Sequence, residues 1–223
     1  MCTPPEPADD TAAWVAIVLA GGGSERLGID KTQVCIDGVP ALDRVLDAVR
    51  AVAGVRTPAA AVLCVGAERG TRAPVTWVRE DPPGAGPAAG VAAAVRVLGE
   101  SHPSAALAVV LAGDLPMLSA SVVDRLLAAV PPPGQADGAR LTDPGGRPQH
   151  LLGAYGVDAL RRSIEQRLDW SDASMRSLLA PLSLVDVPAR GAESLDLDTV
   201  EDVEAAQRLL SAGTPIGPAE EET

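Results

Sequence analysis

The chain has 223 residues, of which 47% are hydrophobic and 22% charged, and this size and balance fit one globular domain. No stretch approaches the roughly 18 consecutive apolar residues that a membrane-spanning helix needs, so contact with a membrane is not expected. The formal net charge of −12 at pH 7 and the aromatic content of 2% argue against nucleic-acid binding, because that function needs a basic surface and stacking side chains.

The three cysteines, Cys2, Cys35 and Cys64, are widely spaced and form no C-x-x-C pair. Neither a disulfide framework nor a zinc site is therefore expected. The N-terminal residues are acidic and proline-rich, where a secretion signal would have a basic stretch followed by an apolar one. These features predict a cytoplasmic protein.

The two ends of the chain differ in composition from the rest. Residues 1–12 and 212–223 are rich in proline and acids and have no hydrophobic period, which is typical of disordered tails. The folded domain is expected to span residues 13–211.

Strands and helices are predicted in alternation through the first part of this domain. Apolar runs predict strands buried on both faces, and amphipathic stretches predict helices. In chain order, these are a strand at Trp14–Leu19, a helix at Ala41–Val52, strands at Ala60–Val65 and Val75–Val78, a helix at Gly90–Leu98, a strand at Ala105–Leu111 and a helix at Ser119–Val130. The alternation predicts an α/β fold with a single doubly wound, mostly parallel sheet and flanking helices, of the Rossmann-like type.

The second part of the domain departs from this alternation. The sequence predicts a small hairpin or irregular insertion first, then helices, one more strand and a final helix. The expected elements are a hairpin from Ala139–Thr142 and Leu151–Tyr155, helices at Val157–Arg167 and Ser174–Leu179, a strand at Leu182–Val187 and a helix at Val200–Leu210. Thr199 and Asp202 resemble a capping box for the last helix.

A glycine-rich loop, Leu19 to Lys31, follows the first predicted strand, where open α/β sheets bind ligands. Gly21–Gly23 let backbone N–H groups approach phosphate oxygens, and Arg26 and Lys31 supply positive charge. Two familiar motifs do not fit, because Arg26 occupies the third glycine position of the dinucleotide fingerprint and Lys31 comes two residues late for a P-loop. The loop predicts a phosphate site of another kind; the alternative is a plain strand-to-helix connection.

Three carboxylates are candidate magnesium ligands. Asp114 directly follows a buried strand, at the same expected sheet edge as the glycine-rich loop, and Mg²⁺ is usually held by one or two carboxylates together with substrate phosphates. Asp196 and Asp198 are two residues apart and share a face if the backbone is extended. The alternatives are a turn aspartate before Pro116, and a helix cap beside a solvated carboxylate.

The stretch Arg79 to Gly90 follows another strand and contains the glycines and prolines of a rigid loop that opens a helix. Asp81 in this loop could accept a hydrogen bond from a sugar hydroxyl or a base N–H. A purely structural loop is the alternative interpretation.

These motifs resemble those of a known family, the nucleotidyltransferases related to molybdenum cofactor guanylyltransferase. The loop LAGGGSERLGIDK is similar to the family's signature LAGG-x-S-x-R-x-G-x-x-K. Further motifs follow in the family's order: GPAAG at Gly86–Gly90, GDLP at Gly113–Pro116, GRPQHLLGAY at Gly146–Tyr155, SMRSLL at Ser174–Leu179 and DLDT at Asp196–Thr199. The resemblance covers nearly all of Trp14 to Leu210.

The chain also departs from the family pattern. Ala88 replaces a leucine, His150 replaces a proline, and Asp196 and Asp198 replace two asparagines. Several relatives carry an asparagine near the end of the strand that ends VLCVG, where it is thought to touch guanine, and this chain contains no asparagine.

The resemblance implies a Mg²⁺-dependent enzyme that transfers a nucleoside monophosphate to a phosphorylated acceptor and releases pyrophosphate. GTP and molybdopterin, or its molybdenum-loaded form, are the implied substrates, and Arg26, Lys31 and Asp114 are the implied catalytic residues. Asp114, Asp198 and Asp196 are the expected metal ligands. The expected nucleotide-binding residues are Leu19, Ala20, Gly21, Gly22, Gly23, Ser24, Arg26, Lys31, Asp81, Gly86, Gly90 and Asp114.

Three alternatives stay open from the sequence. One is a cytidylyltransferase acting on the same acceptor, another is a relative acting on a phosphorylated sugar or hydroxy acid, and the third is a nucleotide-binding module without turnover. The acidic surface would suit transient contact with proteins of the cofactor pathway or with recipient enzymes, although a solvated charged surface explains it equally.

Overall fold

The computed structural model describes residues 13–21, 30–54 and 56–213. The predicted N-terminal tail and most of the predicted C-terminal tail lie outside these ranges. Ala212 and Gly213, expected in that second tail, instead belong to the last helix, α6 (Val200–Gly213).

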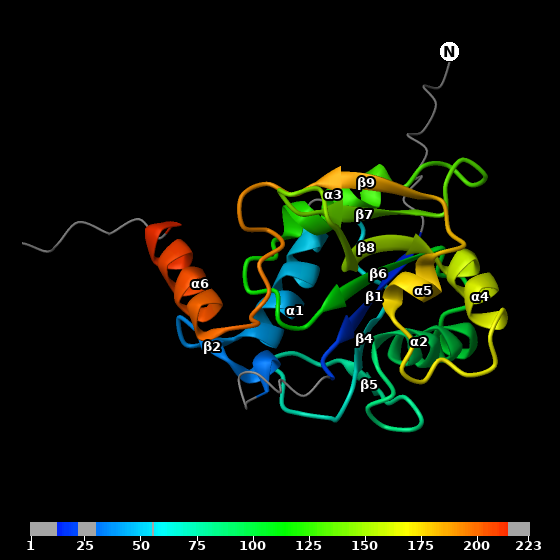
Figure 1. Cartoon of the computed structure of the whole chain (residues 1–223), viewed down its shortest axis with the longest axis horizontal. Helices are drawn as coiled ribbons and strands as arrows, with labels where there is room; N and C mark the ends of the chain where they lie inside the picture. Colours follow the sequence, from blue (N-terminus) through cyan, green and yellow to red (C-terminus); the bar gives the residue numbers. More distant parts are fainter. Residues whose placement is uncertain (1–12, 22–29, 55, 214–223) are drawn as a thin grey trace, which may run out of the picture.

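One mixed sheet forms the centre of the molecule (Figure 1). Its strands lie in the order β5-β4-β1-β6-β8-β7-β9, and β8 alone runs antiparallel to its neighbours in the described part of the chain. The strands are β1 (Trp14–Leu19), β4 (Val62–Val65), β5 (Thr76–Val78), β6 (Leu107–Ala112), β7 (Gly138–Thr142), β8 (Pro148–Gly156) and β9 (Leu184–Pro188). The predicted doubly wound, mostly parallel α/β sheet is thus confirmed.

The hairpin of the second half is part of this sheet. β8 pairs with both β6 and β7, so the two hairpin strands continue the sheet instead of forming a separate insertion. β8 is also longer than the apolar run Leu151–Tyr155 suggests, because the pairing with β7 resumes at Gln149 after an irregularity near Arg140.

Helices cover both faces of the sheet, as expected for a doubly wound fold. One apolar core lies under α1 and α3, and the other lies under α2, α4 and α5. These helices are α1 (Ala41–Ala51), α2 (Pro87–Ser101), α3 (Ala120–Ala129), α4 (Val157–Glu165) and α5 (Met175–Leu179). All six residues of β1 are buried, which matches the reading of this apolar run as a strand with helices on both sides. No helix in the described ranges is long and apolar enough to cross a membrane.

A small hairpin that the sequence analysis missed supports the last helix. β2 (Cys35–Ile36) and β3 (Val39–Pro40) pair antiparallel, and the turn residues Asp37 and Gly38 both have positive φ. Ile36 is buried in a small cluster with residues of the α6 region. This contact holds α6 beside β2 at one end of the molecule (Figure 1).

Candidate active site

A cavity of about 290 Å³ opens at the carboxyl ends of the central parallel strands. This is the edge at which open α/β sheets bind ligands. Its lining combines several expected nucleotide-binding residues with others that the sequence analysis did not name. The lining residues are Leu19, Gly21, Lys31, Thr32, Val65, Glu80, Gly84, Gly86, Pro87, Gly90, Ala112, Asp114 and Leu151.

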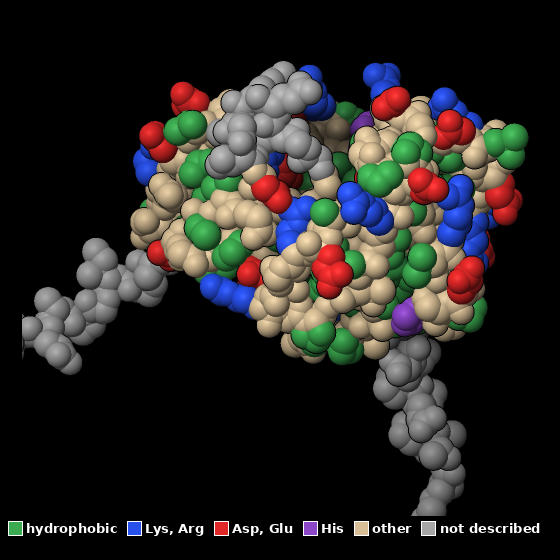
Figure 2. All heavy atoms as spheres, turned by 90° about the horizontal axis from the view of Figure 1, so that it is seen from below, with side chains coloured by type: hydrophobic (Ala, Val, Ile, Leu, Met, Phe, Trp, Pro, Cys, Tyr) green, Lys and Arg blue, Asp and Glu red, His purple; other side chains and the backbone are tan. Residues whose placement is uncertain are grey.

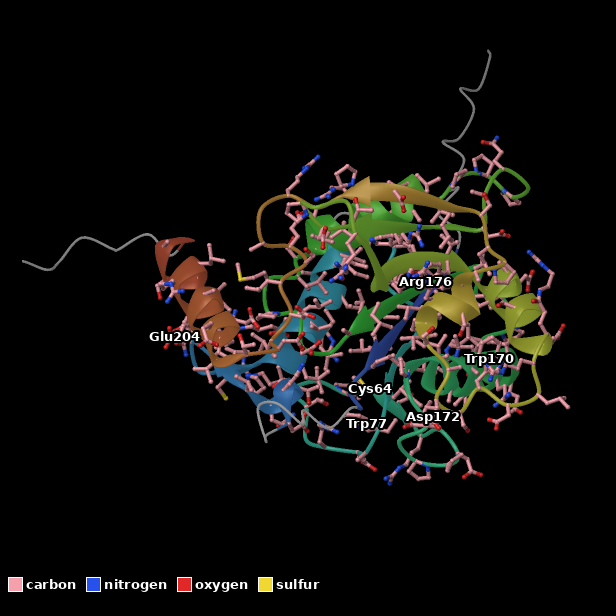
Figure 3. The ribbon with its side chains drawn as sticks, viewed as in Figure 1. Cys64, Trp77, Trp170, Asp172, Arg176 and Glu204 are labelled. Atoms are coloured by element: carbon pink, nitrogen blue, oxygen red, sulfur yellow. The ribbon has the colours of Figure 1, made fainter. Side chains whose placement is uncertain are left out.

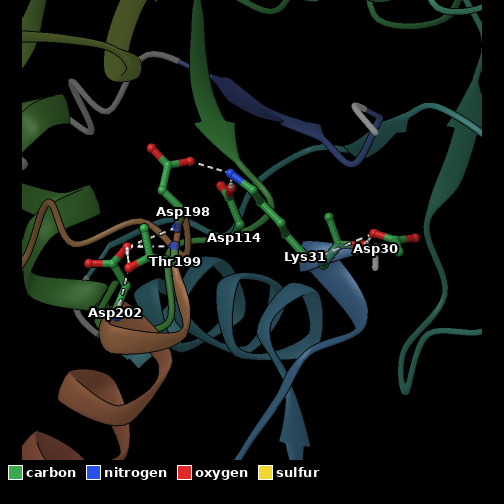
Figure 4. Close-up of polar contacts among 7 residues, drawn as sticks. Asp30, Lys31, Asp114, Asp198, Thr199 and Asp202 are labelled. Carbon is green, nitrogen blue, oxygen red and sulfur yellow. Dashed lines mark hydrogen bonds and ion pairs between the residues drawn. The ribbon is translucent and has the colours of Figure 1, made fainter. Parts of the chain in front are cut away.

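Lys31 and Asp114 line this cavity, and Asp198 lies beside them (Figure 4). The Lys31 ammonium forms a hydrogen-bonded ion pair with Asp198 and lies 4.0 Å from Asp114 Oδ2. The three residues come from the loop after β1, the end of β6 and the segment before α6. The fold thus joins side chains that are 167 positions apart in the sequence.

A short 3₁₀ turn, η1 (Lys31–Gln33), positions Lys31. Asp30 caps the turn by accepting hydrogen bonds from the backbone N–H of Thr32, at 3.1 Å, and from the Thr32 hydroxyl, at 2.7 Å. Arg69, in the loop after β4, contacts Asp30, donates to Thr32 Oγ1 at 2.7 Å and stacks 5.9 Å from the Trp77 ring centroid. Arg69 was not predicted as a site residue, because only the tertiary fold brings it to this turn.

Asp114 follows β6 directly and is mostly buried, with 20% of its side chain exposed. The N–H of the preceding residue, Gly113, donates to the Leu19 carbonyl at 2.9 Å, which ties the Asp114 turn to the end of β1. Burial raises the pKa of Asp114, the Lys31 ammonium opposes this shift, and the Asp196 carboxylate adds to it. A cation at this position would relieve the accumulated negative charge.

The capping box before α6 is confirmed, and it uses neither metal candidate's side chain as a capping group. Asp202 accepts hydrogen bonds from the backbone N–H groups of Asp198 and Thr199, and the Thr199 hydroxyl accepts from the N–H of Asp202. The cap therefore uses the side chains of Thr199 and Asp202, not those of Asp196 or Asp198. Partial desolvation raises the pKa of Asp196, and the neighbouring Asp198 carboxylate raises it further.

These oxygens suit a hard divalent cation. Carboxylates are the ligands that Mg²⁺ prefers, and it commonly uses only one or two of them and completes its shell with phosphate oxygens and water. Within the described ranges, no group of three His, Cys, Asp or Glu side chains is arranged to hold a metal by itself.

The loop after β5 presents Glu80, not Asp81, to the cavity. Asp81 is exposed and does not line it, so the expectation for Asp81 does not match its position. Glu80 is buried; its Oε1 accepts from the Gly84 N–H at 2.9 Å, and its Oε2 has no hydrogen-bond partner among the described residues. Adjacent acids in an extended chain point in opposite directions, and the sequence alone could not distinguish which one faces inward.

The N-terminus of α2 also faces the cavity. Gly86 precedes the helix with φ 92°, a conformation that favours glycine, and no side chain caps the helix. Pro87 occupies the first turn, where its missing N–H costs nothing. The remaining free N–H groups and the helix dipole make this end suitable for an acceptor atom or an anion.

The glycine-rich loop is only partly described. Gly22, Gly23, Ser24 and Arg26 lie outside the described residues. Gly21 approaches Gly66 at the end of β4 so closely that a Cβ on Gly66 would come within 2.9 Å of the Gly21 nitrogen. Other expected residues, namely Ala20, Leu19 and Gly90, are buried around the same edge.

A mostly parallel sheet with a cavity at its carboxyl edge is an architecture of nucleotide-binding α/β proteins. Residues 16–187 match the family described as MobA-like NTP transferase domain. The chain therefore belongs to this nucleotidyltransferase family, which confirms the resemblance found in its motifs. No curated protein matches the sequence significantly.

Solved structures share the fold at low sequence identity. Molybdopterin-guanine dinucleotide biosynthesis protein A from Archaeoglobus fulgidus is 20% identical with a TM-score of 0.63, covering 88% of this chain and 98% of that chain. A nucleotidyl transferase from Methanothermobacter thermautotrophicus is 19% identical with a TM-score of 0.68, covering 91% and 99%. The 4-diphosphocytidyl-2C-methyl-D-erythritol synthase from Anaerococcus prevotii is 13% identical with a TM-score of 0.63, covering 91% and 100%.

Proposed function

We propose that this protein transfers GMP from GTP to a phosphorylated acceptor of the molybdopterin type, with Mg²⁺, and releases pyrophosphate. The observation that carries the proposal is that Lys31 and Asp114 line one cavity beside the uncapped end of α2, with Asp198 paired to the Lys31 ammonium. The chain has a single lysine, and the fold places it at this edge of the sheet.

The reaction is an in-line displacement at the α-phosphorus. An oxygen of the acceptor phosphate forms a new bond to that phosphorus, and the bond from the α-phosphorus to the oxygen that bridges to the β-phosphate breaks. The electron pair of that bond leaves with pyrophosphate, so no covalent enzyme intermediate is required. Catalysis then consists of positioning two anionic reactants and offsetting their charge.

Lys31 is suited to offsetting the negative charge of the two reactants. Its ammonium pairs with Asp198 and lies near Asp114. A triphosphate that enters the cavity would replace these carboxylates as the anionic partner of the ammonium. Arg26, which lies outside the described residues, is proposed for the same role from the signature motif. When bound, a magnesium ion held by Asp114 together with Asp196 or Asp198 would neutralise phosphate charge and polarise the reacting phosphorus.

Glu80 is the residue that we assign to recognition of the nucleoside. Its Oε2 is buried at the cavity without a partner among the described residues, and leaving such an oxygen unpaired is costly. An N–H of a base or a ribose hydroxyl would satisfy it. Guanine offers N–H donors that would satisfy this oxygen, and so do the amino groups of cytosine and adenine. The choice of GTP rests on the resemblance to molybdenum cofactor guanylyltransferases.

A pyrophosphate-release assay with each of the four nucleoside triphosphates, with and without molybdopterin, tests this function. We expect turnover that requires both GTP and the acceptor. Turnover with CTP at least ~tenfold above that with GTP, about 1.4 kcal/mol in transition-state stabilisation, would make the protein a cytidylyltransferase instead. Tight nucleotide binding without pyrophosphate release under any condition would support the module without turnover.

A further inference from the structure

A second pocket lies on the same sheet, next to the nucleotide cavity, and has a basic lining. It has a volume of about 700 Å³ and is formed by β7, the β7–β8 turn, β8, α5 and β9. Four cationic or ionisable side chains line it: Arg140, Arg147, His150 and Arg176. In a chain with net charge −12, three arginines and a histidine in one pocket need a physical reason.

Most of this positive charge lacks a counterion. Arg140 pairs with Asp186 at 2.8 Å. The guanidinium groups of Arg147 and Arg176, by contrast, form no ion pair or hydrogen bond with any residue that the structure describes. Guanidinium groups bind carboxylate and other oxyanions with paired hydrogen bonds, so this arrangement is suited to an anionic ligand.

His150 adds an unsatisfied polar atom to the pocket. Its Nδ1 is buried and has no hydrogen-bond partner in the described part of the chain. Burial and the positive charges of Arg140 and Arg176 lower the pKa of His150, while Asp186 on β9 opposes the shift. An anion placed among these groups would raise that pKa and could accept a hydrogen bond from the ring.

The basic pocket adjoins the nucleotide cavity through β8. Leu151, which lines the nucleotide cavity, packs in the same apolar cluster as Leu179 and Leu184, which line the basic pocket, so both openings lie on one face of the sheet. A single ligand that extends across this strand would therefore contact both. The acceptor phosphate that attacks the α-phosphorus must lie beside Lys31, so the basic pocket serves a different group.

We propose that Arg140, Arg147, His150 and Arg176 bind a second anionic group of the acceptor. This assignment rests on the proposed function and narrows its substrate class: the acceptor is an elongated molecule with a phosphate at one end and another oxyanion at the other. The pocket sets acceptor affinity and takes no part in bond making or breaking.

Arg176 offers the cleanest variant to test the pocket. It is exposed and lies on α5, on the opposite side of the molecule from Glu204 on α6 (Figure 3). Arg176→Gln breaks no ion pair among the described residues and should fold normally. Arg208→Gln is the matched control, because Arg208 pairs with Glu204 and its loss removes the same charge far from the pocket.

The first measurement is a titration of the wild-type protein with inorganic phosphate or molybdate, followed by NMR of the two histidines. We expect the anion to raise the pKa of His150 by about one unit, a tenfold change in proton affinity. The response should disappear in Arg176→Gln and persist in Arg208→Gln. No response of His150 up to ~50 mM anion would overturn the anion site.

The second measurement is the pyrophosphate-release assay with molybdopterin. Arg176→Gln should raise the KM for the acceptor at least ~tenfold, while the KM for GTP stays within about twofold. An anion response of His150 together with an unchanged acceptor KM would mean that the pocket serves another anion, which overturns the assignment. Absence of turnover with any nucleotide would instead overturn the proposed function and with it the link to the acceptor, and the NMR titration would still decide whether an anion binds.

Discussion

Lys31 is the only lysine in a chain with 18 basic residues, and it is the residue on which the proposed chemistry depends most. Its side chain is 19% exposed, and its ammonium lies between two carboxylates from distant parts of the sequence. An ordinary surface lysine would instead point into solvent, where an ion pair contributes little. The position therefore favours a role in the site over a role in stability.

Replacing Lys31 tests this directly. Lys31→Ala should fold but lose at least ~100-fold in kcat/KM, roughly 2.7 kcal/mol of transition-state stabilisation, because no other described cation lines the cavity. Lys31→Arg keeps the charge and should retain more activity than the alanine variant. Near-wild-type kinetics of a well-folded Lys31→Ala protein would remove the lysine from the mechanism.

Substitutions at Asp114 and Asp198 distinguish the two candidate positions of the primary metal ligand. Asp114→Asn keeps the size and turn preference but removes the charge that holds a hard cation, so turnover should fall and its dependence on Mg²⁺ concentration should weaken. Asp198→Asn should be milder, because Asp198 is engaged with Lys31 and related enzymes use asparagine at this position. The reverse order of effects, measured across a range of Mg²⁺ concentrations, would make the segment before α6 the primary metal site.

Some residues of the site could be predicted from the sequence, and others could not. The carboxylates at Asp114, Asp196 and Asp198 could be assigned to one site because each follows or precedes a clear element. Glu80 and Arg69 could not, because the first depends on which of two adjacent acids faces inward and the second on a loop that folds back over η1. The buried, unpartnered Glu80 oxygen has no signature in the sequence.

At the scale of elements, apolar patterning predicted the α-helices and the strands of the main sheet, with bounds shifted by a few residues. The β2–β3 hairpin was missed, because each strand has only two residues and periodicity needs a longer run. Its Asp37-Gly38 turn carried a usable signal, since Asp-Gly favours the positive φ angles of tight hairpins. The position of β8 in the sheet could not be predicted from the sequence, because either strand of a hairpin can pair with the neighbouring strand of the sheet.

The capping box of α6 links helix stability to the site. Asp202→Ala removes the acceptor for the backbone N–H groups of Asp198 and Thr199, and loss of a cap costs about 1–2 kcal/mol. We expect a small drop in melting temperature and a larger drop in activity, because the segment that carries Asp198 loses its anchor. Glu201→Ala in the same helix turn is the control, and equal effects of the two variants on activity would contradict this link.

At the scale of the whole molecule, two apolar cores lie on either side of one sheet, and the site lies at the edge of that sheet. The charged side chains on the face seen in Figure 2 are of mixed sign, so the net charge of −12 is not gathered there into one acidic surface. Such a surface suits solubility more than a dedicated acidic docking site.

The ends of the chain should contribute little to stability. A protein that spans residues 11–213 should melt at nearly the same temperature as the full chain, because the removed segments contain few apolar side chains to bury. Thermal unfolding followed by circular dichroism checks this expectation. A drop of more than about 5 °C, equivalent to roughly 1 kcal/mol or more at this size, would show that an end packs against the domain.

The central claim is that the cavity holding Lys31 and Asp114 transfers a nucleoside monophosphate to the acceptor. The most direct measurement follows the label from GTP carrying radioactive phosphorus at the α position, incubated with Mg²⁺ and molybdopterin. The α label should appear in the acceptor product in proportion to the pyrophosphate released, and Asp114→Asn should lower both. Label that stays in GTP, or appears only as free GMP, would contradict it.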